Sequence, residues 1–317
     1  MGFIGKRLST TLLTLFLVSL LTFAAFRLIP GDAALLALGT EATEEQLASL
    51  RVEMGLDKSF PAQYFSWLGN LLTGRLGYSS RFMGAPVSEI ILERLPVTLA
   101  LAGFSFLLIT LIAFPLSLLS VKKENSVTSR VITTLTALNI SMPPFFLGLL
   151  FIWVFGIILR VFVPGAFVSY QESPAAFFGY LFFPALTIAL PSAALVLKFL
   201  RSAIFREFKS DYARSAKSKG ASPSHILRRH VLKNASLPAI SLFGMIAGEI
   251  LAGSIIVEQV FGIPGMGRLL IASINARDYP LIQTIMIYIA FAVILANTLA
   301  DIVLQMMDPR IRLSQKV

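Results

Sequence analysis

The chain has no cysteine and only two histidines among its 317 residues. The absence of cysteine excludes disulfides, cysteine-ligated metals, iron–sulfur clusters and thiol nucleophiles together. Charged residues are also scarce, at 14%, whereas 56% of the residues are hydrophobic and the mean hydropathy is +0.79. Soluble proteins average about 25% charged residues. A soluble fold of this length could not bury such an apolar excess, so the composition predicts a polytopic membrane protein and argues against a cytosolic enzyme.

Six runs are apolar enough to cross a bilayer, which needs roughly 20 residues per helix. They are Leu8–Phe26, Val97–Val121, Val131–Leu159, Ser173–Leu197, Ala235–Val257 and Tyr279–Ala300. The fold class predicted is therefore an all-α integral membrane protein with six transmembrane helices. The third run exceeds the ~30 Å hydrocarbon core, so it should overhang, tilt or bend, and Pro143-Pro144 is the expected bend. The first run resembles a signal peptide, but its length and the lack of a small-x-small site favour an uncleaved span.

The Lys and Arg residues predict the orientation of these spans. If the N-terminus is cytoplasmic, 18 of the 27 basic residues lie on the inner side and nine on the outer side, six of them in one long loop. Cytoplasmic loops carry the excess of Lys and Arg, so both termini should be cytoplasmic. The net charge of +10 is then a topology signal and does not require a nucleic-acid partner.

This topology divides the chain into four parts. Residues 1–29 form the cytoplasmic N-terminus and first span, and residues 30–96 form an outer loop with short helices. Residues 97–305 form the core with the other five spans, including a cytoplasmic loop over residues 201–234. Residues 306–317 form a cytoplasmic tail.

The outer loop contains two helix signals. Thr43 and Gln46 have the spacing of a capping box, and Gly55 is a suitable helix end. The segment Gln63–Leu68 favours a second, amphipathic helix whose aromatic side chains suit a headgroup layer. The loop could be a lid over the outer face or a docking surface for an external partner, and the sequence leaves both open.

The cytoplasmic segment Lys198–Lys233 carries ten basic and two acidic residues. Its pattern predicts a helix as far as Ala216, a stop at Gly220, an N-cap at Ser222 and a second helix over Pro223–Asn234. One interpretation is that these charges only form a solvated face on the cytoplasmic side. The other is that the helical turn receives force from a soluble motor protein and passes it to the membrane helices.

The segment Asp211–Gly220 followed by Leu237-Pro238 resembles the cytoplasmic coupling loop of ABC importer permeases of the dipeptide/oligopeptide/nickel family. The long outer loop resembles the first of the two permeases that such systems encode. Seven further segments match in order along the chain. They are Arg27–Asp32, Met54–Asp57, Gly74–Ser79, Glu93–Thr98, Val257–Phe261 with Pro264–Gly267, Arg277–Pro280 and Asp308–Arg312. The family's Glu-Ala-Ala motif reads Arg214-Ser215-Ala216 here, so a salt bridge of that Glu does not carry over to this chain, whereas the role of the loop does.

The resemblance implies a type I ABC importer permease fold in a bacterial or archaeal inner membrane. It also implies the partners: a second permease, two ATP-binding subunits that hold ATP and Mg, and an external substrate-binding protein. The cargo would be peptides or related solutes such as nickel complexes. A short helix would couple this chain to one ATP-binding subunit. The residues assigned to it are Asp211, Tyr212, Ala213, Arg214, Ser215, Ala216, Lys217, Gly220 and Ala221.

Catalytic and cofactor motifs are absent from the sequence. It has no phosphate-binding Gly-x-x-x-x-Gly-Lys-Ser/Thr loop, no HExxH and no serine nucleophile elbow. His225 and His230 are five apart, which is not the spacing of a helical metal pair. We therefore expect no catalytic site, no metal site and no cofactor bound by this chain.

Three features of the spans suggest roles in transport. Glu249 interrupts the fifth run, and a charge within a membrane is by default a functional candidate. It either lines the path and favours cationic groups, or is hydrogen-bonded between helices or protonated. Gly244 and Gly248 have GxxxG spacing, which more often means plain helix packing than a subunit interface. The outer gate is assigned to the loop after the fifth run, which is expected to re-enter or cap the outer face. Its residues are Phe261, Gly262, Pro264, Gly265 and Gly267.

An ion-coupled secondary transporter is the main alternative, because it would also show six spans. It would need its own ion-coupling residues, and Glu249 alone is a convincing candidate. A channel would need a filter motif, which the sequence lacks. The resemblance leaves the cargo open, because in such systems the external binding protein performs much of the selection.

Overall fold

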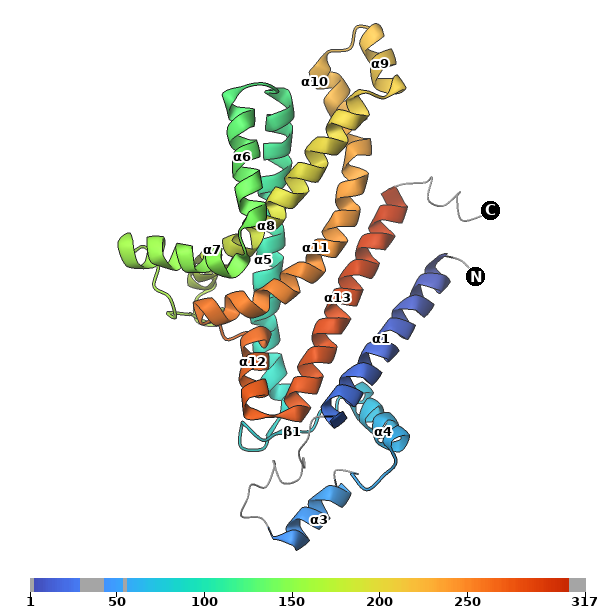
Figure 1. Cartoon of the computed structure of the whole chain (residues 1–317), viewed down its shortest axis with the longest axis vertical. Helices are drawn as coiled ribbons and strands as arrows, with labels where there is room; N and C mark the ends of the chain where they lie inside the picture. Colours follow the sequence, from blue (N-terminus) through green and yellow to red (C-terminus); the bar gives the residue numbers. More distant parts are fainter. Residues whose placement is uncertain (1–2, 29–42, 54–55, 308–317) are drawn as a thin grey trace. The chain divides into compact units, whose positions relative to one another are not determined.

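The computed structural model describes residues 3–53 and 56–307, except residues 29–42. The segment Asp308–Arg312 and parts of Arg27–Asp32 and Met54–Asp57 lie outside the described residues. The chain separates into two compact units. Unit 1 comprises Met1–Thr98 and Pro264–Ile294, and unit 2 comprises Leu99–Ile263 and Leu295–Val317. Figure 1 labels the elements of both, and each unit is described by itself.

Unit 1 contains the first span, the outer loop and the segment that follows the fifth span. Its elements are α1 (Phe3–Leu28), α3 (Glu44–Glu53), α4 (Phe60–Leu72), β1 (Tyr78–Ser79), β2 (Ala85–Pro86), the start of α5 (Val87–Lys122), α12 (Met266–Ala276) and most of α13 (Tyr279–Met307). The two strands pair antiparallel, with Tyr78 opposite Pro86. Buried side chains from the start of α5, from α12 and from α13, among them Ile91, Leu269 and Leu281, form the core of this unit.

Unit 2 contains the remaining spans. Its elements are the rest of α5, α6 (Val127–Ser141), α7 (Pro144–Phe151), the π-helix η1 (Ile152–Ile158), α8 (Pro174–Phe208), α9 (Asp211–Ser218), α10 (Pro223–Ile226), the π-helix η2 (Leu227–Val231), α11 (Leu232–Phe261) and the end of α13. Helix α8 packs against α6, α7 and α11, and is therefore the central helix of the unit. Fifteen of its side chains are buried, so its apolar residues cover nearly all its faces.

The number of spans agrees with the sequence prediction if the bent third run counts as one. Within the described residues, five helices are long and apolar enough to cross a membrane. The sixth candidate is the pair Val127–Ser141 and Pro144–Ile158, bent by 108° at the break between them. The predicted bend at Pro143-Pro144 is thus confirmed, because Pro143 has no N–H to donate and adopts an extended conformation at the N-cap of α7. The helices also run past the uncharged segments, since a helix end outside the hydrocarbon can carry charge.

The two short helices of the outer loop form as predicted, and one of them also packs on α1. The capping box at the start of α3 is confirmed: Thr43 N–H donates to Gln46 Oε1 at 2.9 Å, and Gln46 N–H donates to Thr43 Oγ1 at 3.3 Å. The aromatic side chains of α4 divide between two environments. Tyr64 is 2% exposed, lies against Phe23 of α1 and hydrogen-bonds Ser19 at 2.8 Å, whereas Phe65 is 62% exposed and its predicted place at the headgroups stays a prediction. The sequence could not show that α1 offers a complementary aromatic side chain.

Candidate coupling helix, translocation helix and outer gate

Helix α9 is a separate helix, and the prediction of one helix continuing to Ala216 is wrong. Helix α8 ends at Phe208, and α9 begins at Asp211 after a break. Ser210 adopts an extended conformation there (φ −69°, ψ 157°), and its hydroxyl donates to the carbonyl of Glu207 at 2.6 Å. Serine competes with the helical backbone through such local bonds, and the apolar periodicity gave no sign of it.

The inner face of α9 is fixed to the chain's own core. Ala213 is 3% exposed and belongs to a buried cluster with Ile226, Leu227 and Val231. Ala216 lies partly buried against the same cluster. Their small side chains permit close approach of α9 to α10 and η2.

The outer face of α9 is polar and exposed. Arg214 forms an ion pair with Asp211 one turn earlier, but both side chains are mostly exposed, so the pair contributes little to stability. Ser215 and Lys217 are also exposed. Tyr212 donates its hydroxyl to the carboxylate of Glu207 and so fixes α9 to α8. Partial burial, and secondarily this hydrogen bond, raise the pKa of Tyr212 above its usual value of 10.0.

The turn after α9 has the predicted geometry. Gly220 is left-handed (φ +83°), and the bonds from Gly220 N–H to Lys217 and from Ala221 N–H to Ala216 complete a Schellman motif. Ser222 caps the next helix by accepting the N–H of His225 at 3.3 Å, and Pro223 is its first residue. These two predictions are confirmed.

The π-helix η2 follows α10 and brings the two histidines together. The rings of His225 and His230 have centroids 6.1 Å apart, because about one extra residue per turn places positions five apart on one face. Among the residues that the structure describes, no group of three His, Cys, Asp or Glu side chains could hold a metal ion.

Glu249 lies on an exposed face of α11. Met245 and Ile256, at helical spacing on either side, are 55% and 49% exposed. The carboxylate of Glu249 makes no hydrogen bond or ion pair with the described residues. A hydrogen bond to a neighbouring helix of this chain, one alternative to a role in the path, is therefore absent from the described part. The sequence reasoning missed Glu258, which follows the uncharged run and has a fully buried side chain.

Gly244 provides close packing between two helices of this chain. A Cβ atom built at Gly244 would lie 2.6 Å from Cβ of Ala300 on α13. A contact this short is not tolerated, so glycine is required for the two helices to approach. At Gly244 the interpretation as plain helix packing is confirmed.

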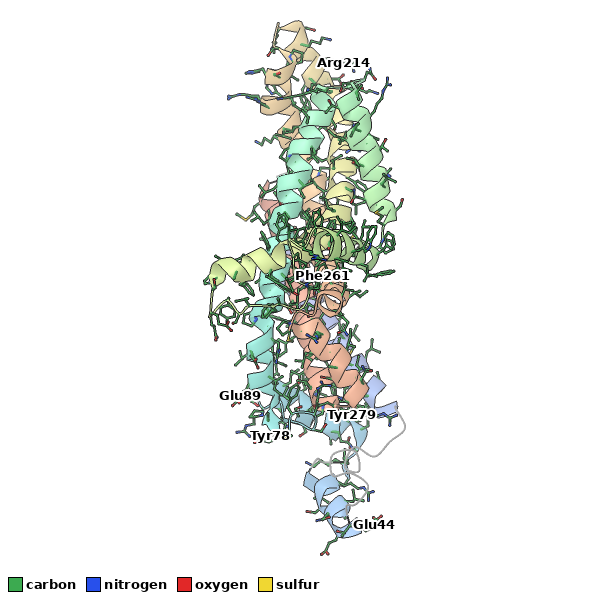
Figure 2. The ribbon with its side chains drawn as sticks, turned by 90° about the vertical axis from the view of Figure 1, so that its left-hand side faces the viewer. Glu44, Tyr78, Glu89, Arg214, Phe261 and Tyr279 are labelled. Atoms are coloured by element: carbon green, nitrogen blue, oxygen red, sulfur yellow. The ribbon has the colours of Figure 1, made fainter. Side chains whose placement is uncertain are left out.

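The gate candidates in unit 2 lie in an aromatic cluster. Phe261, at the end of α11, is 1% exposed and packs against Phe162. Tyr180 of α8 donates its hydroxyl to the carbonyl of Phe261 and accepts the N–H of Gly165 at 2.9 Å. Gly262 is left-handed (φ +71°) and ends α11. Figure 2 shows that Phe261 and Arg214 of α9 lie far apart within unit 2.

The gate candidates in unit 1 belong to the start of α12. Gly265 is the N-cap residue, and Gly265, Met266 and Gly267 are buried. Met266 N–H donates to Thr98 Oγ1 at 2.8 Å. Pro264 is half-buried. The segment between α11 and α12 is therefore a short turn between two helices, and the expectation that it re-enters or caps the outer face stays a prediction. The sequence reasoning did not predict α12, although Leu269, Leu270 and Ser273 have helical spacing.

A second cluster in unit 1, the outer corner, joins two of the segments that carry the family resemblance. We define it as Ser79, Arg81 and Asp278. The carboxylate of Asp278 is fully buried, accepts the hydroxyl of Ser79 and the N–H of Arg81, and accepts the N–H of Leu281 at the start of α13. Arg81 also donates to the carbonyl of Ala272 at 2.8 Å. Figure 2 labels Tyr78 and Tyr279, which adjoin this cluster in the sequence.

The described helices, five or six of which are long and apolar enough to cross a membrane, define a polytopic helical membrane protein. Comparison with known families specifies the class. Residues 113–313 match the binding-protein-dependent transport system inner membrane component family, and residues 1–102 match the N-terminal family of the same kind of membrane component. The chain belongs to this family. It is a permease with the type I ABC importer fold, and a multi-pass protein of the inner membrane.

Its relatives are similar over nearly their whole length. A probable peptide ABC transporter permease protein of Sinorhizobium fredii is 33% identical over 310 residues, which cover 98% of this chain and 99% of the relative. A putative peptide transport system permease protein of Brucella abortus is 34% identical and covers 97% and 98%. A dipeptide transport system permease protein of Lactococcus lactis is 32% identical and covers 98% and 99%.

Proposed function

We propose that this chain is one of two permeases in an ATP-driven, binding-protein-dependent importer of peptides. The observation that carries this proposal is similarity along almost the full length of relatives named as peptide permeases. The partners are a second permease, two cytoplasmic ATP-binding subunits that hold ATP and Mg, and an external binding protein. A nickel complex is the alternative cargo. A ligand screen on the external binding protein distinguishes a peptide cargo from a nickel complex, because that protein selects the cargo.

We further propose that α9 is the coupling helix. Its exposed face, with Arg214, Ser215 and Lys217, would enter a cleft of an ATP-binding subunit. Ala213 connects α9 to η2 and α11, and the hydrogen bond of Tyr212 connects it to α8. Movement of α9 would therefore displace both of these spans together.

A variant that tests this coupling should add bulk to α9 without disturbing the fold of the chain itself. Ala216 contacts the chain's own core, so a large residue there would disturb the fold itself. Ser215 is exposed, and Ser215→Trp adds bulk on the outward face only. We expect ATP-dependent uptake to fall roughly tenfold or more, since overpacking an interface costs about 1–3 kcal/mol. Recovery of the ATP-binding subunits with the tagged permease should fall in parallel. Ser224→Trp, on the exposed surface of α10, is the control, and equal behaviour of the two variants would reject the assignment.

Glu249 is proposed to line the translocation path, where it would attract the amino terminus of a peptide. Its exposure on α11 and its lack of a partner among the described residues support this role. Glu249→Gln should slow uptake of a peptide with a free amino group more than uptake of its N-acetylated form. If both cargoes respond equally, the carboxylate does not recognise the amino terminus.

The turn from Phe261 to Gly267 is proposed as part of the outer gate. The buried aromatic ring of Phe261 and the hydrogen bond from Tyr180 hold this turn in one conformation. Phe261→Ala should therefore make proteoliposomes leak a small solute in the absence of ATP. If proteoliposomes with Phe261→Ala do not leak the solute and take up peptide normally, Phe261 has no gating role.

A further inference from the structure

A groove between α6 and α8 has no role in the coupling, path or gate described above. Its volume is about 610 Å³, and it lies within unit 2. Its polar lining includes Thr133, Lys198 and Arg201, and its apolar lining includes Ile140, Leu197 and Phe205. No acidic side chain lines it.

Two cations face this groove from one side of α8. Lys198 and Arg201 are three residues apart, so they project from the same face of the helix. Lys198 is exposed and forms no hydrogen bond or ion pair with the described residues. The groove thus carries positive charge that the described part of the chain does not neutralise.

Arg201 is held in place by neutral partners. Its guanidinium donates to the hydroxyl oxygens of Thr133 and of Ser129, the second at 3.3 Å, and lies 5.5 Å from the ring centroid of Phe205. The hydroxyl of Thr133 donates in turn to the carbonyl of Ser129 at 2.8 Å, so its oxygen is free to accept from the arginine. An arginine has five N–H donors. The two bonds orient the group and leave one N–H on each terminal nitrogen for an anion, whereas the N–H of Nε is buried.

The groove lies at the end of a predicted membrane span. Lys198 directly follows the uncharged run Ser173–Leu197, on the side predicted to be cytoplasmic. Leu135, Leu138 and Phe199, on the same two helices, are each at least half exposed and offer an apolar surface. Basic pockets between transmembrane helices on the cytoplasmic side bind anionic headgroups.

We propose that this groove binds one anionic phospholipid from the inner leaflet. The phosphate lies between Lys198 and Arg201, and the acyl chains lie along Leu135 and Leu138. Glu249, the residue proposed to line the peptide path, does not line this groove, so the proposal does not depend on the identity of the cargo.

The test is native mass spectrometry of the complete transporter, purified with its partner subunits and titrated with phosphatidylglycerol or phosphatidylcholine. Wild type should bind phosphatidylglycerol in preference to phosphatidylcholine. Lys198→Gln with Arg201→Gln should weaken phosphatidylglycerol binding about tenfold or more, since each basic residue attracts anionic lipid appreciably. Lys122→Gln, at the exposed end of α5, removes a cytoplasmic charge outside the groove and should leave binding unchanged.

Loss of Arg201 could disturb the packing of α6 on α8, so Lys198→Gln alone is the second variant. Lys198 has no partner among the described residues, and its removal should weaken phosphatidylglycerol binding severalfold without changing the thermal stability of the complex. Unchanged lipid binding in this variant overturns the proposal. Displacement of the lipid by inorganic phosphate or by a peptide with a free carboxylate also overturns it, because the groove would then be an anion or cargo site.

Discussion

The coupling helix α9 and the outer corner are held by opposite kinds of interaction. Helix α9 is fixed mainly by a small alanine in an apolar cluster, with one exposed hydrogen bond from Tyr212 to Glu207, and its charges point outward. The outer corner is fixed by a buried carboxylate with three directional hydrogen-bond donors. Non-directional packing tolerates small shifts, whereas a buried charged network is lost as a unit when a partner is removed. The difference suits α9 to transmitting movement and the outer corner to resisting it.

The largest effect is expected at the outer corner. Asp278→Ala removes the carboxylate that joins the β1–β2 hairpin to α13, and leaves the Ser79 hydroxyl and the Arg81 N–H without an acceptor. Hydrogen bonds to charged groups contribute about 1.5–3 kcal/mol each, so we expect a loss of roughly 3 kcal/mol or more. Thermal unfolding of the purified complex measures it. Asp57→Ala, an exposed carboxylate in the same unit, should change little, and similar values for both variants would mean that the outer corner is not fixed by Asp278.

The contact between α11 and α13 should respond next. Gly244→Ala places a methyl group 2.6 Å from that of Ala300, and such overpacking costs about 1–3 kcal/mol. Ala300→Gly in the same chain should restore most of the loss. Gly253→Ala is the matched control, because nothing lies within 4 Å of its built Cβ. Failure of Ala300→Gly to rescue would show that this contact is not the cause.

A smaller effect is expected at α9. Tyr212→Phe removes the hydrogen bond to Glu207 and should cost about 1 kcal/mol, detected as faster amide exchange in α9. Because folding raises the pKa of Tyr212, the folded state disfavours the phenolate. The stability that the protonated Tyr212 hydroxyl gives to the folded state is fully present below pH 10. It is lost as the pH rises above 10 and the hydroxyl ionises. Wild-type α9 should therefore loosen in that range, and the Phe variant should not. The same alkaline loosening in both would contradict this assignment.

The smallest effect is expected at the start of α3. Thr43→Ala removes the capping-box acceptor and should cost about 0.5–1 kcal/mol, limited to that helix. Ser59→Ala is the comparison, since Ser59 precedes α4 without a side-chain capping bond. Amide exchange should become faster in α3 for Thr43→Ala and should change little in α4 for Ser59→Ala. Equal increases in the two helices would argue against a capping role for Thr43.

The sequence predicted those features that depend on local pattern. The apolar runs predicted the spans, Pro143-Pro144 predicted the bend, and Gly220 with Ser222 predicted the turn after α9. The sequence did not reveal contacts between distant segments. Asp278 meets Ser79 across 199 residues, and α4 meets α1 through Phe23 and Tyr64. The break at Ser210 was missed because it depends on a local hydroxyl bond that apolar periodicity does not report.

The outward face of α9 is proposed to contact an ATP-binding subunit. Because the natural chain has no cysteine, Ser215→Cys gives a single reactive thiol on that face. A short thiol-to-amine cross-linker applied to the assembled transporter should join this permease to an ATP-binding subunit, and the yield should change when ATP is added. Ser224→Cys should cross-link much less. If Ser215→Cys gives no product with an ATP-binding subunit, or the same yield as Ser224→Cys, α9 is not the coupling helix.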